Sequence, residues 1–257
     1  MNLLEAVVLG AVQGVTEFFP VSSSGHLVIF QHLFGMKEPQ LAFDIFLHIG
    51  TLASVLIFFR HDITALFGRD RKLLAPLAIA SVPTFIIGFF FKDTVERLFG
   101  APSFVGYMLI VTSAWLFAAS LYERNRARAE KNTNSWPGMA ASLLVGTAQG
   151  VAVLPGISRS GATIATGIMS GMEKSSACRF SFLLSVPAVA GASILKLHKI
   201  GAGLTAADAP QFIAGGIASA LFGIASIKFL LRIVSGGKLY LFGIYCFLAG
   251  LITIILV

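Results

Sequence analysis

The chain has 257 residues, of which 56% are hydrophobic and only 12% are charged. Soluble domains carry about 25% charged residues, so this composition excludes a water-soluble globule and a disordered chain. Two cysteines are too few for a disulfide scaffold. The apolar residues form long unbroken runs, whereas a transmembrane β-barrel shows alternating segments of about ten residues. The sequence therefore predicts an all-α integral membrane protein.

Apolar segments of spanning length follow one another along the chain, and two of the apolar regions are interrupted. A membrane-spanning helix needs about 20 mostly apolar residues. In chain order we expect a broken region over 3–35, spans over 42–60, 73–91 and 104–122, a second broken region over 139–171, and spans over 180–196, 211–231 and 239–257. The polar segment 123–136 links the first broken region and its three spans to the second broken region and its three spans.

The net charge of +7 comes from basic residues in short loops between these spans. With the N-terminus outside and six crossings, the inside loops carry Arg60, Arg69, Arg71, Lys72, Arg124, Arg126, Arg128, Lys131, Lys174, Arg179, Lys228, Arg232 and Lys238. The outside loops carry Lys37, Lys92, Arg97, Lys196 and Lys199. This bias agrees with the positive-inside rule. It predicts that both termini lie outside, and it does not indicate a nucleic-acid partner.

The two broken regions resemble each other. A shift of 136 residues without a gap aligns Gln13, Ser22, Ser24 and Gly25 with Gln149, Ser158, Ser160 and Gly161. If each broken region enters and leaves the membrane on one side, each half crosses three times, and the second half is inverted. We therefore expect one membrane domain over 1–257, with inverted repeats over 1–125 and 139–257. Their broken helices would meet near the bilayer midplane.

Ionisable groups at membrane depth are costly and usually functional, and the first broken region holds Glu17 and His26. Gln13 precedes Glu17 by four residues, so the two side chains share one helix face. Pro20 ends that helix, and the serines after it can cap a new helix that begins near Gly25. The N–H groups and positive dipole end of that new helix form an anion site.

The second broken region repeats this arrangement. A Pro155-Gly156 break is followed by Arg159, which stands where the first region has Ser23. The planar guanidinium of arginine suits phosphate or carboxylate groups. The hydroxyl side chains near it are Ser158, Ser160 and Thr163. Two opposed helix N-termini, several hydroxyls and an arginine predict a site for a phosphate or diphosphate.

Structural explanations exist for the same residues. Serine-rich segments let helices pack closely, and Glu17 and Arg159 can form a purely structural ion pair. His26 can be a hydrogen-bonded packing residue. Asp44 and His48 lie near the start of a predicted span, where they would be ordinary interfacial residues.

The sequence resembles the undecaprenyl pyrophosphate phosphatases of bacteria, a family also called bacitracin resistance proteins. The first family signature corresponds to residues 13–26, where a Gln and a Glu four residues apart are followed by Pro-Val-Ser-Ser-Ser-Gly-His. The second corresponds to residues 155–163, Pro-Gly-Ile-Ser-Arg-Ser-Gly-Ala-Thr. The length and the order of the spans extend this resemblance over the whole chain.

The resemblance implies hydrolysis of undecaprenyl diphosphate to undecaprenyl phosphate and inorganic phosphate, which recycles the lipid carrier for cell-wall synthesis and confers bacitracin resistance. It also implies a multi-pass protein of the bacterial cytoplasmic (inner) membrane. The family fold has six spans and two re-entrant helical hairpins, with a pocket that opens to the outer face. A divalent cation, Mg²⁺ or Ca²⁺, is implied as cofactor. Some family members have a second Glu where this chain has Gln13, so a metal site with two carboxylates is not expected here.

The roles within the site are hypotheses at this point. Arg159 is expected to clamp the diphosphate, and the nucleophile is Ser23, His26 or a water molecule. His26 is also a candidate general acid or base. Glu17 would orient His26 or hold the cation, with Gln13 in support. The expected diphosphate-binding residues are Ser22, Ser24, Gly25, Ser158, Ser160, Gly161 and Thr163.

Transport is the second function class, because inverted repeats with broken helices at the midplane are typical of secondary transporters. Such a protein would move an anion or flip a polyprenyl phosphate. The expected partners are a polyprenyl diphosphate and membrane lipids, and a homo-oligomer is left open.

Overall fold

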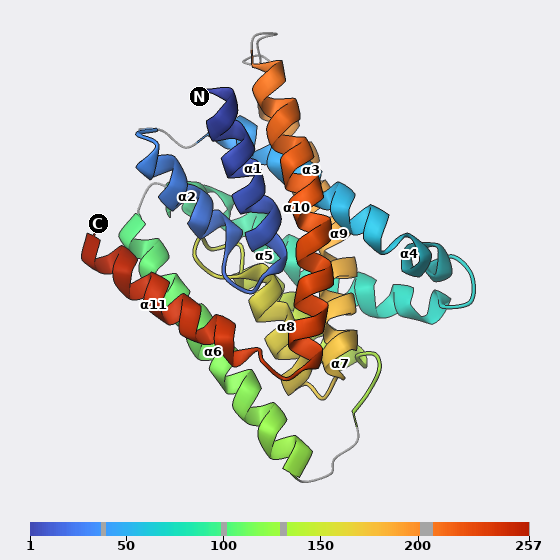
Figure 1. Cartoon of the computed structure of the whole chain (residues 1–257). Coiled ribbons are helices and arrows are strands. Elements are labelled where there is room, and N and C mark those ends of the chain that lie inside the picture. The colour runs from blue at the N-terminus through green and yellow to red at the C-terminus, as the bar shows by residue number, and fades with distance from the viewer. Residues whose placement is uncertain (37–39, 99–101, 129–132, 201–207, 257) are drawn as a thin grey trace.

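The computed structural model describes residues 1–36, 40–98, 102–128, 133–200 and 208–256. Within these ranges the chain folds into helices and contains no β-strand (Figure 1). The helices are α1 (Leu3–Phe18), α2 (Ser23–Leu33), α3 (Leu41–Phe58), α4 (Arg60–Leu66), the 3₁₀ helix η1 (Arg71–Leu73), α5 (Leu74–Leu98), α6 (Pro102–Arg128), α7 (Met139–Val151), α8 (Arg159–Met169), α9 (Lys174–Ile200), α10 (Ala209–Ser235) and α11 (Tyr240–Leu256). The all-α prediction is confirmed.

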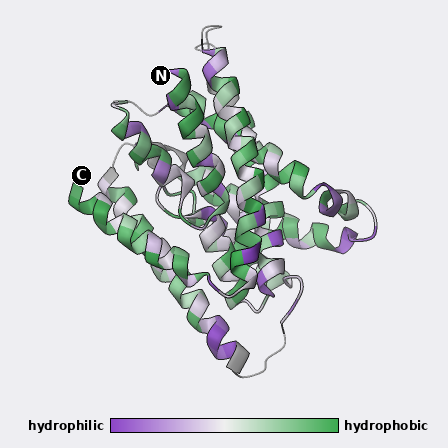
Figure 2. Cartoon of the chain, viewed as in Figure 1, coloured by the Kyte–Doolittle hydropathy of each residue, from purple (hydrophilic) through white to green (hydrophobic). Residues whose placement is uncertain are grey.

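Among the described residues, five helical segments are long and apolar enough to cross a membrane. They are Leu41–Phe58, Arg71–Phe91, Ser103–Arg126, Lys174–Leu195 and Ala209–Ser235. α11 is apolar but has only 17 residues. Figure 2 shows hydrophobic residues along most of each helix and a hydrophilic stretch near the C-terminal end of α6. The chain is therefore a multi-pass integral membrane protein.

Several helices extend beyond the apolar runs that predicted them. α5 continues past residue 91, α6 continues past residue 122, and α9 begins before residue 180. Hydropathy marks only the part of a helix that matches the hydrocarbon core. Backbone hydrogen bonding continues into the polar interface, so each predicted apolar run lies in a helix, but the helix ends are shifted.

Both predicted helix breaks are present. α1 ends shortly before Pro20, and α2 begins at Ser23 with Ser22 as its N-cap. Ser22 has a φ of 68°, a left-handed conformation that costs a non-glycine residue about 1–3 kcal/mol. α8 begins at Arg159 with Ser158 as its N-cap. Ser23 and Arg159 are therefore the first residues of their helices, as the alignment of the two regions predicts.

Glycines allow two pairs of helices to cross closely. A Cβ on Gly10 of α1 would overlap the carbonyl oxygen of Gly215 in α10. A Cβ on Gly146 of α7 would overlap the carbonyl oxygen of Ala80 in α5. Small residues are favoured where membrane helices approach each other. These crossings hold α1 against α10 and α7 against α5 (Figure 1).

A buried aromatic cluster lies next to the break that follows α1. The ring centroids of Phe18 and Phe182 are 5.5 Å apart, in an edge-to-face arrangement. Phe59 follows α3, and its ring centroid lies 5.7 Å from that of Phe182. The cluster joins α1 to α9, so the preceding residue, Glu17, projects from a well-packed helix end.

Candidate active site

The start of α8 packs against the turn that leads into α2. Ser160 Oγ donates a hydrogen bond to the carbonyl oxygen of Phe19 at 3.0 Å. A Cβ on Gly161 would lie 3.2 Å from the Cβ of Pro20. Two helix N-termini, each with unpaired N–H groups and a positive dipole end, are thereby brought close together.

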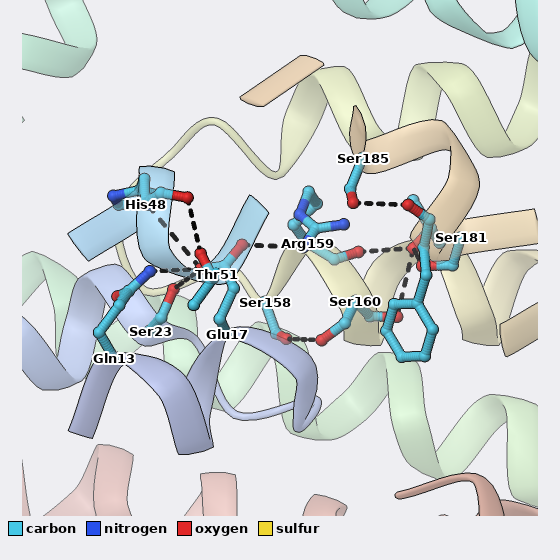
Figure 3. A network of polar contacts seen from close by, with 12 residues as sticks. Gln13, Glu17, Ser23, His48, Thr51, Ser158, Arg159, Ser160, Ser181 and Ser185 are labelled. Carbon is cyan, nitrogen blue, oxygen red and sulfur yellow. Dashed lines mark hydrogen bonds and ion pairs between the residues drawn. The ribbon is translucent and has the colours of Figure 1, made fainter. Parts of the chain in front are cut away.

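The carboxylate of Glu17 lies between these helix starts (Figure 3). Its Oε1 accepts a hydrogen bond from Arg159 Nη2 at 2.8 Å. Its Oε2 accepts one from Ser23 Oγ at 2.6 Å and one from Gln13 Nε2 at 2.9 Å. The side chains of Glu17 and Arg159 are only 6% and 15% exposed. Four residues expected at the site are therefore in contact, and the ion pair that joins the two halves is buried.

Two atoms of this cluster lack a hydrogen-bond partner among the residues that the structure describes. They are Arg159 Nη1, a donor, and Gln13 Oε1, an acceptor, and both are buried. A buried polar atom without a partner costs about 1–3 kcal/mol. A purely structural ion pair gives no reason for this cost, whereas a bound ligand with oxygens and a cation would satisfy both atoms.

The capping serines make matching contacts in the two regions. Ser22 Oγ accepts a hydrogen bond from the Gly25 amide at 3.3 Å and lies 3.3 Å from Ser24 Oγ. The corresponding distances are 3.1 Å from the Gly161 amide to Ser158 Oγ and 3.2 Å from Ser158 Oγ to Ser160 Oγ. These residues cap the helices, so the Gly25 and Gly161 amides are already engaged. Their contact with substrate stays a prediction.

Thr163 lies one turn into α8, and its side chain is bonded to the backbone of Arg159. Its hydroxyl donates to the Arg159 carbonyl at 2.8 Å and lies 2.6 Å from Ser181 Oγ of α9. On α6, Thr112 Oγ1 accepts from the Ser158 amide at 3.0 Å. Ser181 and Thr112 could not be assigned to the site from the sequence, because only the folded chain brings α6 and α9 to this helix start. The direct substrate contact expected of Thr163 stays a prediction.

His26 is bonded to Ser22 and Tyr245 rather than to Glu17. Its Nδ1–H donates to the Ser22 carbonyl at 2.7 Å, because a carbonyl can only accept. On a neutral ring, its Nε2 then accepts from the hydroxyl of Tyr245 in α11 at 2.7 Å, and the two rings stack. Both ring nitrogens are engaged in this conformation. A role in acid–base or covalent chemistry for His26 stays a prediction that requires the ring to leave Tyr245.

His48 of α3, by contrast, lies beside Glu17. Its Nε2 is 3.8 Å from Glu17 Oε2, and its side chain is 32% exposed (Figure 3). Sequence analysis left it as an ordinary interfacial residue, although its place inside an apolar helix could have marked it. Asp44, one turn earlier, accepts a hydrogen bond from Gln31 Nε2 at 2.7 Å.

The residues around Glu17 include oxygen donors that could hold a divalent cation together with substrate oxygens. No group of three His, Cys, Asp or Glu side chains suitable for a metal occurs in the described part of the chain. Mg²⁺ commonly binds one or two carboxylates plus substrate phosphates and water. Glu17 and the unpartnered Gln13 Oε1 fit that pattern, since both are hard oxygen donors.

Fold and site together define a multi-pass integral membrane protein with a buried Glu17–Arg159 ion pair beside the starts of α2 and α8. A comparison with protein families makes this more specific. The chain belongs to the bacitracin resistance protein BacA family, whose model matches residues 6–252.

Curated relatives match over nearly their whole length. The undecaprenyl-diphosphatase of Carboxydothermus hydrogenoformans is 44% identical over 260 residues, covering 100% of this chain and 98% of the relative. That of Desulforapulum autotrophicum is 42% identical over 277 residues, with 99% and 98% covered. That of Methanosphaera stadtmanae is 40% identical over 279 residues, with 100% and 98% covered.

Proposed function

We propose that this chain is an undecaprenyl-diphosphatase. It hydrolyses undecaprenyl diphosphate to undecaprenyl phosphate and inorganic phosphate, and thereby recycles the lipid carrier and confers bacitracin resistance. The family and its relatives support the reaction. The observation that carries it is Arg159, whose Nη2 is bonded to Glu17 while its buried Nη1 is left for an anion.

Ser23 is the nucleophile of this proposal. Its hydroxyl donates to Glu17 Oε2 at 2.6 Å, so the carboxylate is placed to take the hydroxyl proton as the oxygen attacks. A bond then forms between Ser23 Oγ and the terminal phosphorus, and the bond from that phosphorus to the bridging oxygen breaks. Undecaprenyl phosphate leaves, and water hydrolyses the phosphoserine to release inorganic phosphate.

Arg159 stabilises the charge of this transfer. Its Nη2 holds Glu17 in place, while its Nη1 donates to the oxygens of the terminal phosphate, where negative charge is concentrated. The N–H groups at the starts of α2 and α8 add fixed donors. The prenyl tail extends from this polar site among apolar helix surfaces and lipid.

A divalent cation, Mg²⁺ or Ca²⁺, completes the proposal. Glu17 and Gln13 Oε1 would hold it together with diphosphate oxygens. When bound, it offsets the negative charge of the diphosphate and of the leaving group.

We further propose six crossings and two re-entrant hairpins, related as inverted repeats, with α11 as the sixth crossing. Two close contacts between the halves correspond to each other: Gly10 of the first half meets Gly215 of the second, and Gly146 of the second half meets Ala80 of the first. A shift of 136 residues takes Gly10 to Gly146 and Ala80 to Gly216, the neighbour of Gly215. The matching serine caps support the same relation.

The proposed location is the bacterial cytoplasmic (inner) membrane, with both termini and the mouth of the site on the outer face. The excess of basic residues in the opposite loops supports this orientation. Both termini lie towards the left of Figure 1, and α4, which carries Arg60, lies at the far right.

Phosphate release by purified protein in detergent tests the proposed function. Detergent leaves no second compartment, so a protein that only transports an anion or flips a lipid releases no phosphate. We expect release from a prenyl diphosphate by the wild type and none above background by Arg159→Ala. Absence of release from a folded wild-type preparation supplied with Mg²⁺ or Ca²⁺ would favour the transport alternative.

A further inference from the structure

His48 reaches the catalytic carboxylate from a different helix. It lies on α3, whereas Glu17 and Gln13 lie on α1, and its Nε2 is 3.8 Å from Glu17 Oε2. Its other ring nitrogen, Nδ1, is 2.7 Å from the Asp44 carbonyl oxygen. A carbonyl only accepts, so Nδ1 carries a proton and donates it. On a neutral ring, Nε2 then carries a lone pair that faces Glu17.

A lone pair and a carboxylate oxygen 3.8 Å apart repel each other unless a proton or a metal cation lies between them. Arg159 does not supply this positive charge, because its Nη2 is bonded to the other oxygen, Oε1. Two ligands at about 2.0–2.4 Å from one cation lie about 3–4 Å from each other. The separation of Nε2 and Oε2 falls within that range.

Gln13 provides the third donor. Its Nε2 donates to the same Glu17 Oε2, while its Oε1 is buried and has no hydrogen-bond partner among the described residues. A flip of the Gln13 side-chain amide exchanges Nε2 and Oε1, which are nearly isosteric. Oε1 would then face the point between Glu17 and His48.

We infer that His48 Nε2, Glu17 Oε2 and Gln13 Oε1 form the protein side of a divalent-cation site. Metal-binding histidines usually donate their second ring N–H to a backbone carbonyl or a carboxylate, as His48 does to Asp44. The site deepens the proposed function, because it adds a ligand to the carboxylate that also activates Ser23. An imidazole ligand favours Mn²⁺, Co²⁺ or Zn²⁺ relative to Ca²⁺.

Binding of Mn²⁺ alone to the purified, metal-free protein tests this inference without turnover. Electron paramagnetic resonance of free Mn²⁺ gives the affinity, and electron spin echo modulation by ¹⁴N detects a nitrogen ligand. We expect nitrogen modulation in the wild type. In His48→Gln the modulation should disappear while most of the affinity remains, because an amide oxygen takes the place of the ring nitrogen.

Two further variants separate coordination from folding. His48→Leu supplies no donor atom, so it should lose the nitrogen modulation and bind Mn²⁺ about 10-fold or more weakly. His61→Ala removes an exposed histidine of α4 and should change neither measurement.

The inference is overturned if His48→Gln keeps both the affinity and the nitrogen modulation. In that case a proton, and not a metal cation, lies between His48 Nε2 and Glu17 Oε2. It is equally overturned if the wild type binds no Mn²⁺ at millimolar concentration. Phosphate release, assayed separately on the same preparations, shows whether the proposed function stands when the cation site fails.

Discussion

The two terminal nitrogens of Arg159 have different partners, and this difference predicts the effect of a lysine at the same position. Nη2 donates to Glu17, and Nη1 is left for a phosphate oxygen. A lysine ammonium is a point charge without a planar fork, so it cannot serve both groups in this geometry. We expect Arg159→Lys to lower kcat for phosphate release about 10²–10³-fold, as the loss of one preorganised donor does.

Arg179→Lys is the matched control for this measurement. Arg179 is half exposed, and its Nη1 lies 3.7 Å from Asp62 Oδ1. Exposed ion pairs contribute little, so this variant should keep nearly all of its activity. Wild-type kcat in Arg159→Lys would contradict the separate roles of the two nitrogens.

Ser23 gives a second prediction at the residue scale. If its oxygen attacks phosphorus, Ser23→Ala should lower the rate of phosphate release by at least about 10³-fold, because no other hydroxyl donates to Glu17 Oε2 in the described structure. Acid quenching of the wild type during turnover should trap a phosphopeptide that contains Ser23, detected by mass spectrometry. A Ser23→Ala variant that retains most of its rate would assign the attack to water instead.

Contacts within the two broken regions were predictable from sequence, whereas contacts between distant helices were not. The shared face of Gln13 and Glu17 follows from helical spacing, and their hydrogen bond confirms it. The place of Arg159 opposite Ser23 follows from the alignment of the two regions. His48 could not be assigned in this way, because its distance from Glu17 depends on how α3 packs beside α1. The same reason explains why Tyr245, the partner of His26, was missed.

At the scale of elements, the closest helix crossings depend on single glycines. The space for a Cβ on Gly146 is filled by the backbone of Ala80, which cannot move without moving α5. We expect Gly146→Ala to force α7 and α5 apart and to lower stability by about 1–3 kcal/mol. Thermal unfolding in detergent should show this loss. Gly10→Ala should also lower stability, because a Cβ there would overlap the backbone of Gly215.

Gly88→Ala is the control for these two substitutions. Gly88 also lies in α5, but a Cβ added there meets no described atom within 4 Å. Alanine is the better helix former by about 0.5–1 kcal/mol, so this variant should be neutral or slightly more stable. Equal losses in Gly88→Ala and Gly146→Ala would show that the crossing is not what limits stability.

Helix existence was predictable from sequence, but helix ends were not. All six apolar spans correspond to helices, since apolar runs of that length have few alternatives in a membrane. The predicted spans left out the charged ends of α6 and α9, because hydropathy falls at the membrane interface while the helix continues. The breaks after α1 and α7 were located well, because proline and glycine act through local backbone geometry.

At the scale of the whole molecule, the proposed inversion explains why the site combines unlike residues. A shift of 136 residues pairs Glu17 with Val153, Ser23 with Arg159 and His26 with Ala162. One half therefore supplies the carboxylate and the hydroxyl, and the other supplies the guanidinium. Two helix starts that face each other let a single anion contact both halves, and the site is complete only when the halves pack together.

The inverted arrangement predicts which positions are accessible from each side of the membrane. Asn2, Arg69 and Lys238 are exposed, whereas the native Cys178 and Cys246 are buried and should not interfere with thiol labelling. In intact spheroplasts, an impermeant maleimide should label Asn2→Cys but neither Arg69→Cys nor Lys238→Cys. Permeabilised membranes should give labelling of all three. If the first broken region instead crossed the membrane completely, Arg69→Cys would react from outside, and the re-entrant arrangement would have to be abandoned.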